Sequence, residues 1–114
     1  MPNVIDMLLV DFSNAAITYG EELDTGNSRA ANKANRAAQK VYNDLKSLGE
    51  EHRILDLLDF ANPAVRLMAA TKALKIEPKR GEVVLEKLSQ GPSGGVNAMA
   101  YTALLMWRKD QAAT

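Results

Sequence analysis

The chain has 114 residues, of which 46% are hydrophobic and 25% are charged, so it is long and apolar enough for one domain with a buried core. Its 14 Lys and Arg side chains balance 14 Asp and Glu side chains, which excludes the strong positive charge typical of proteins that mainly bind nucleic acid. The absence of cysteine excludes disulfides, thiolate catalysis and a structural zinc site with the usual ligands.

The first half of the chain predicts two long amphipathic helices. Residues 4–24 place their apolar side chains on one face, and they follow Asn3, a residue type that caps helix N-termini. Residues 28–48 carry a stripe made mainly of alanine, and Gly49 is a natural left-handed stop. A turn between the two would bring them together as a helical hairpin.

The second half predicts four shorter helices, at residues 50–60, 63–75, 79–90 and 96–109. Asn62 followed by Pro63 is typical of a cap and a first helical turn, and residues 91–95, with sequence GPSGG, are a strong loop signal. No stretch alternates as a strand would, so the predicted fold class is all-α with about six helices. We expect a single domain over residues 1–109 and a flexible tail at 110–114.

A sequence pattern repeats within this second half. Residues 65–74 read VRLMAATKAL and residues 96–105 read VNAMAYTALL, so Val, Met, Ala, Thr and Leu return after 31 residues. The segment LDLL at 55–58 is echoed by LEKL at 85–88. A return at this period is typical of stacked helix pairs. We therefore expect one pair over residues 50–76 and the next over residues 79–109, after an atypical N-terminal pair.

The first of these pairs resembles HEAT and armadillo-like repeats, whose second helix often carries an early proline, then Val-Arg, an Ala-Ala pair and a Leu. The matching residues are Pro63, Val65-Arg66, Ala69-Ala70 and Ala73-Leu74. The last unit departs from the pattern, with Asn97 in place of Arg66, and the step from Ala70 to Ala73 is one residue longer than usual. The whole chain also resembles a small bacterial family of single-domain HEAT-like proteins of uncharacterised function. The resemblance implies a short right-handed α-α superhelix of hairpins stacked side by side, and it brings no catalytic residues.

Arg66 lies in the middle of the apolar arc of its predicted helix. A guanidinium in that position needs a carboxylate or carbonyl groups as partners. We expect Arg66 to pair with Asp56 or Asp59 of the preceding helix and to lock the helix pair together. In that case truncation of Arg66 would cost about 2 to 4 kcal/mol of stability. The alternative is that Arg66 contacts an anion or a phosphate.

The predicted helix at 96–109 has almost no polar face, although the end of a repeat stack normally needs one. Either the first helix folds over it or its alanine-rich side tolerates water, or a second copy or another protein covers it. Tyr101 and Trp107 are expected in the core. Residues at matching positions of the two second helices form a row whose thioethers suit an adaptable contact. This candidate partner interface consists of Met68, Thr71, Met99, Thr102 and Met106.

Neither catalysis nor cofactor binding is indicated by any motif. The glycine-rich stretch at 91–95 lacks the Lys-Ser/Thr ending of a phosphate-binding loop, and His52 has no second His or Cys with which to hold a metal. We therefore predict a non-enzymatic protein-binding module, without cofactor, whose partner is another protein or a second copy in a homodimer. One alternative is an immunity or antitoxin-type inhibitor that binds a toxin. A DNA-binding module that uses the basic residues Lys33, Arg36, Lys40 and Lys46 is another.

The N-terminus lacks a basic segment before its first apolar residues, and no apolar run approaches the roughly 18 to 20 residues that span a bilayer. We expect a soluble, cytoplasmic protein without membrane association.

Overall fold

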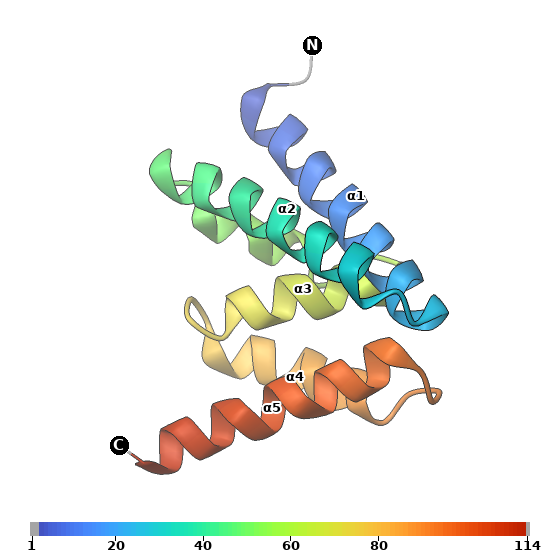
Figure 1. Ribbon diagram of the computed structural model, residues 1–114. Helices are drawn as coiled ribbons and strands as arrows, with labels where there is room; N and C mark the ends of the chain where they lie inside the picture. Colours follow the sequence, from blue (N-terminus) through green and yellow to red (C-terminus); the bar gives the residue numbers. More distant parts are fainter. Residues whose placement is uncertain (1–2, 114) are drawn as a thin grey trace.

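The computed structural model describes residues 3–113, and every regular element in that range is a helix (Figure 1). The elements are α1 (Val4–Thr25), α2 (Ser28–Ser47), the 3-10 helix η1 (Glu51–Leu57), α3 (Pro63–Ala73), α4 (Pro78–Ser89) and α5 (Gly95–Ala113). The predicted all-α fold class with six helices is confirmed. Residues 1, 2 and 114, which belong to the predicted domain and tail, lie outside the described range.

The local signals at the helix ends act as predicted. The side chain of Asn3 accepts a hydrogen bond from the Asp6 amide at 2.8 Å, and Asn62 accepts one from the Ala64 amide at 2.8 Å. These caps satisfy amide groups that a helix N-terminus leaves without partners. After α2, Gly49 adopts the left-handed conformation, with φ of 71°. The ends of the helices are therefore set by short-range chemistry.

Two helices differ in extent from the prediction. The third is a 3-10 helix over residues 51–57, and turn and bend residues connect it to the start of α3. The last helix continues past residue 109 to Ala113. Residues 110–113 contain no glycine or proline and end in Ala-Ala, which favours helix. Residues 110–113 of the predicted tail therefore extend α5.

The helices form a stack with α3 in its middle (Figure 1). On one side α3 contacts α1 and η1, while α1 packs along α2. On its other side α3 contacts α4, which packs against α5. Helix α3 is the most thoroughly buried element, and its buried residues are Ala64, Val65, Leu67, Met68, Ala69, Ala70 and Ala73. The core of the domain is thus centred on α3.

The contact between α3 and α4 depends on Gly81. A Cβ atom at this position would lie 2.9 Å from the carbonyl oxygen of Ala70 and 3.0 Å from the amide nitrogen of Leu74. Both of these are backbone atoms that a side-chain rotation cannot move. The absence of a side chain at Gly81 therefore lets α4 lie directly on the backbone of α3.

We expect Gly81→Ala to destabilise the fold by about 1 to 3 kcal/mol, because the clash outweighs the better helix propensity of alanine. Urea unfolding measures this loss. Gly94→Ala is the control, since the nearest atom to its added Cβ is Asp24 Oδ1 at 3.7 Å. Its stability should stay within about 0.5 kcal/mol of the parent. Equal stability of both variants would show that α3 and α4 do not need this close approach.

Candidate functional site

Helix α5 is attached to the domain along one side only. Its residues Ala100 and Leu104 are buried. The Trp107 indole N–H donates a hydrogen bond to Glu82 Oε1 at 3.0 Å, and Arg108 forms an ion pair of 2.8 Å with Glu86. All these contacts hold α5 against the rest of the domain, mainly α4.

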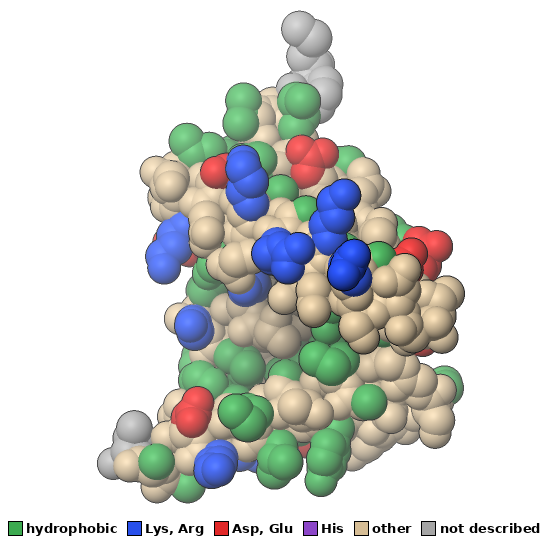
Figure 2. Space-filling view, in the orientation of Figure 1, with side chains coloured by type: hydrophobic (Ala, Val, Ile, Leu, Met, Phe, Trp, Pro, Cys, Tyr) green, Lys and Arg blue, Asp and Glu red, His purple; other side chains and the backbone are tan. Residues whose placement is uncertain are grey.

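The opposite side of α5 carries large exposed apolar side chains. We define the α5 outer face by Ala98, Tyr101, Thr102, Leu105 and Met106, all of which are exposed. Figure 2 shows hydrophobic side chains gathered along this helix. Helix α1 meets α5 at the helix start, where a Cβ on Gly95 would lie 2.6 Å from Leu23 Cβ, and it does not cover the outer face. The first helix therefore leaves most of α5 open.

The repeat explains why this face is open. Tyr101 and Leu105 of α5 correspond to Ala70 and Leu74 of α3. Ala70 and Leu74 are 0% and 6% exposed, because α4 lies on them, whereas Tyr101 and Leu105 are 60% and 54% exposed. Within residues 3–113 no element lies on α5 as α4 lies on α3. The α5 outer face is thus the end of the stack.

The structure divides the predicted Met/Thr interface between core and surface. Met68 is only 5% exposed and belongs to the core, and the half-buried Thr71 donates its hydroxyl hydrogen bond to the Met68 carbonyl. Met99, Thr102 and Met106 are exposed on α5. Met68 and Thr71 are covered because other helices pack on both sides of α3. The residues on α5 remain exposed because its outer side has no such neighbour within residues 3–113.

Tyr101 was expected in the core and instead projects from the surface. The signal that could have revealed this is the repeat itself: a large aromatic replaces an alanine that must be buried in the preceding unit. Trp107 is half-buried, and its indole N–H donates a hydrogen bond to Glu82. Tyr101 therefore belongs with Leu105 in the candidate interface, whereas Trp107 attaches α5 to α4.

The predicted ion pair between Arg66 and Asp56 or Asp59 does not occur among residues 3–113. Asp56 accepts a hydrogen bond of 2.9 Å from Nε of Arg53, three residues earlier on η1, and Arg53 also lies 3.5 Å from Asp6. Asp59 is exposed. Arg66 lines a cavity on the side of α3 toward α4, and its buried Nε has no hydrogen-bond partner. The pairing is lost because the nearer Arg53 occupies Asp56.

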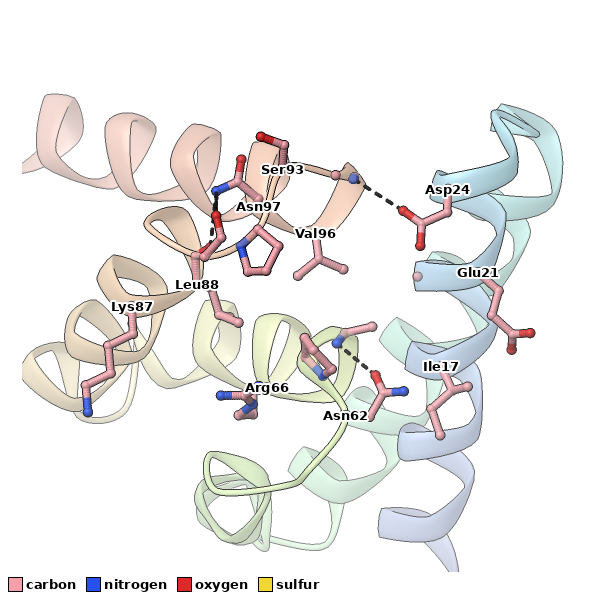
Figure 3. A pocket seen from close by; sticks show the side chains of 17 residues that line it. Ile17, Glu21, Asp24, Asn62, Arg66, Lys87, Leu88, Ser93, Val96 and Asn97 are labelled. Carbon is pink, nitrogen blue, oxygen red and sulfur yellow. Dashed lines mark hydrogen bonds between the residues drawn. The ribbon is translucent and has the colours of Figure 1, made fainter.

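The cavity beside Arg66 has a volume of about 390 Å³ and lies between α1, the start of α3, the end of α4 and the loop before α5 (Figure 3). Its apolar wall includes Ile17, Ala64, Leu88 and Val96. Charged side chains at its edge are Glu21, Asp24, Arg66 and Lys87. The Asp24 carboxylate accepts a hydrogen bond of 3.4 Å from the Gly95 amide.

Asn97 ties the loop that closes one side of this cavity. Its amide group donates hydrogen bonds to the carbonyl oxygens of Leu88 at 3.4 Å and Gly91 at 3.3 Å, and it also contacts the Ser89 carbonyl. These contacts connect the first turn of α5 with the end of α4. Asn97, which replaces the Arg66 of the preceding unit, therefore has a structural role.

The outer side of α2 is basic. Arg29, Lys33, Arg36 and Lys40 are exposed and recur at steps of three or four residues, which places them along one helix face. We call these four residues the α2 basic stripe, and Figure 2 shows Lys and Arg side chains gathered over this helix. Lys40 also pairs with Asp44 at 3.4 Å, the one acidic residue of α2. The remaining predicted basic residue, Lys46, is exposed near the end of the helix.

Lys72 lies beneath this surface, in the joint between α2 and α3. Its Nζ sits 5.2 Å from the centre of the Tyr42 ring and donates a hydrogen bond to Gln39. Burial, helped by the nearby charge of Lys75, lowers the pKa of Lys72 below its ordinary value. This cation thus connects two helices and is not part of the α2 basic stripe.

Residues 3–113 thus form an all-helical domain with an exposed apolar face on α5, a basic face on α2 and a cavity beside Arg66. The chain belongs to the family described as Domain of unknown function (DUF2019), whose model matches residues 6–105. No curated protein and no solved structure matches the chain. Among the helices of residues 3–113, none has the length and apolar character that crossing a membrane requires.

The geometry of Arg66 changes the expected result of mutating it. Because its buried Nε lacks a partner, Arg66→Met should leave stability unchanged or raise it by up to about 1 kcal/mol, with the apolar contacts of the side chain retained. Chemical denaturation measures the difference. The control is Arg53→Met, which removes the contacts to Asp56 and Asp6 at a half-buried surface position and should change the free energy of unfolding only slightly, because ion pairs in contact with water contribute little. A loss of several kcal/mol for Arg66→Met would show that its guanidinium holds the fold together.

Proposed function

We propose that this chain is a HEAT-like protein-binding module without catalytic activity of its own, and that its α5 outer face binds an α-helix of another protein. The observation that carries the proposal is the unequal burial of two helices with the same repeated sequence. In α3 the positions of Ala70 and Leu74 are covered by α4, and in α5 the corresponding Tyr101 and Leu105 are exposed.

A helix is the occupant that this face fits best. The domain already binds a helix at the corresponding positions of α3, where α4 lies along Ala70 and Leu74. Helix packing of this kind uses ridges of side chains spaced three and four residues apart, and Tyr101, Leu105 and Ala98 have that spacing. A partner helix on α5 would therefore continue the stack by one layer.

The apolar side chains of the α5 outer face would supply the binding energy, and the size of Tyr101 would restrict which side chains the partner helix can place there. Full burial of a large apolar side chain is worth about 1.5 to 3 kcal/mol before the costs of association. Tyrosine is common at binding hot spots because its ring buries a large area and its hydroxyl can remain hydrogen-bonded. Since Tyr101 is larger than Ala70, the partner helix must offer a gap for the ring, and small residues at its closest approach would provide one.

The test is site-specific cross-linking followed by a binding measurement. A photoreactive phenylalanine analogue at Met106 identifies what contacts α5 in native lysate, and mass spectrometry maps the cross-linked segment. We expect a helical segment of one partner, and Leu105→Glu should weaken its binding by about tenfold or more. The matched control is Val83→Glu, which introduces the same charge at a 54% exposed apolar residue of α4.

Three outcomes would count against the proposal. Equal effects of Leu105→Glu and Val83→Glu would show that charge alone disturbs binding. Cross-links to an extended or non-protein partner would remove the helix as occupant. A dimer by light scattering that Leu105→Glu converts into a monomer would mean that the face binds a second copy and not another protein.

The α2 basic stripe favours DNA binding as a second candidate function. Four exposed cations along one helix can contact about four phosphates, and the affinity should then rise about tenfold when the salt concentration is halved. Fluorescence anisotropy with a duplex of mixed sequence measures this change. Lys33→Glu should reduce the gain to about sixfold or less, because at most three contacts remain, and Leu105→Glu should not alter it. Halving the salt without any gain in binding would rule this candidate out.

A further inference from the structure

We propose that the cavity beside Arg66 is a binding site for a small amphipathic carboxylate. In this site the guanidinium of Arg66 pairs with the carboxylate, and the apolar body of the ligand lies against Ile17, Leu88 and Val96. The cavity is separate from the α5 outer face and from the α2 basic stripe, so this site does not depend on the function proposed above.

The first observation is an unused guanidinium. Arg66 lines the cavity, and within residues 3–113 no ion pair or hydrogen bond engages its side chain. Buried and half-buried polar groups are normally hydrogen-bonded, because their partners replace the water lost on folding. A carboxylate suits the planar donors of a guanidinium, with which it forms charge-assisted and often bidentate hydrogen bonds.

The charges around the cavity leave room for an anion. The Asp24 carboxylate accepts a hydrogen bond from the Gly95 amide and forms no ion pair with Arg66, and Glu21 points away from the cavity in Figure 3. Lys87 also lines the cavity, but its ammonium group points away from it in Figure 3. The first turn of α5 also faces this space through Val96 and Asn97, and the positive end of a helix dipole favours negative charge nearby. The guanidinium is thus not neutralised by the acidic residues of the same wall.

The walls and the size of the cavity indicate that the ligand also has an apolar part. Its volume of about 390 Å³ falls within the range of about 300 to 1,000 Å³ found for ligand pockets. Ile17, Leu88 and Val96 offer only hydrocarbon to a ligand, which a compact inorganic anion would not use. One guanidinium beside an apolar wall therefore matches a monocarboxylate with a short hydrocarbon or ring body.

The test is a titration of isotope-labelled protein, followed by two-dimensional NMR, with three probes. Octanoate carries the charge and the apolar body, octanamide carries the body without the charge, and inorganic phosphate carries charge without the body. We expect saturable shifts with octanoate at the amides of Gly20, Ala64 and residues 94–97. Octanamide should bind about tenfold more weakly, because it lacks the charge-assisted hydrogen bond, and phosphate should not produce saturable shifts.

The variants test whether Arg66 is responsible. Arg66→Met should lower octanoate affinity about tenfold, to that of octanamide. The matched control is Arg80→Met at the start of α4, where the arginine is exposed and pairs with Glu77 at 3.3 Å, and it should bind octanoate as the parent does. If Arg66→Met does not fold, the comparison of octanoate with octanamide on the parent protein decides the question.

The proposal would be overturned if octanoate gave no saturable shifts up to its solubility limit, or if phosphate bound as well as octanoate. Equal affinity for octanoate and octanamide would also overturn it. So would unchanged octanoate affinity in a folded Arg66→Met protein. Shifts centred on Tyr101 and Leu105 would also overturn it, because they would place the ligand on the α5 outer face.

Discussion

The close packing of α3 against neighbours on two sides is the constraint on which the rest of this domain depends. Glycine and alanine make that packing possible. On one side Gly20 of α1 lies so near Ala64 that an added Cβ would be 2.6 Å from the alanine Cβ. On the other side Gly81 of α4 lies against the backbone at Ala70. Because small residues face each other at both contacts, the helices stack at short range, and α3 forms the centre of the core.

The outer side of α5 is exposed, whereas both sides of α3 are covered. The repeated sequence gives α5 the same apolar pattern as α3, but within residues 3–113 a helix covers these positions only on α3. The apolar residues that α3 uses toward α4 therefore remain exposed on α5, where Tyr101 replaces Ala70. Repeat architectures usually place polar residues on a terminal outer face, and a large exposed apolar patch on such a face is typical of an interaction site. The exposed face thus follows from the repeated pattern and from the absence, within residues 3–113, of a helix over the outer side of α5.

The positions and ends of the helices could be predicted from the sequence. The contacts between different helices could not. The helix positions follow from periodicity, and the ends follow from Asn3, Asn62 and Gly49, whose effects act within one turn. The partner of Arg66 was not predictable, because a helical wheel gives the direction of a side chain around its own axis but not which element lies there. Asp56 also had a nearer cation, Arg53, on its own helix turn. The exposure of Tyr101 could not be predicted, because a helical wheel does not show which faces of a helix another element covers.

Arg66 and Asn97 occupy the same position in the two units and both line the cavity. They differ in whether their hydrogen-bond donors have partners within the described residues. The amide of Asn97 donates to backbone carbonyls at the end of α4, so its donors are used in holding the loop. Arg66 lines the same cavity with donors that no described residue engages, although a buried donor without a partner costs stability. One wall of the cavity is therefore held by hydrogen bonds between described residues, whereas the other carries a guanidinium with which no described residue pairs.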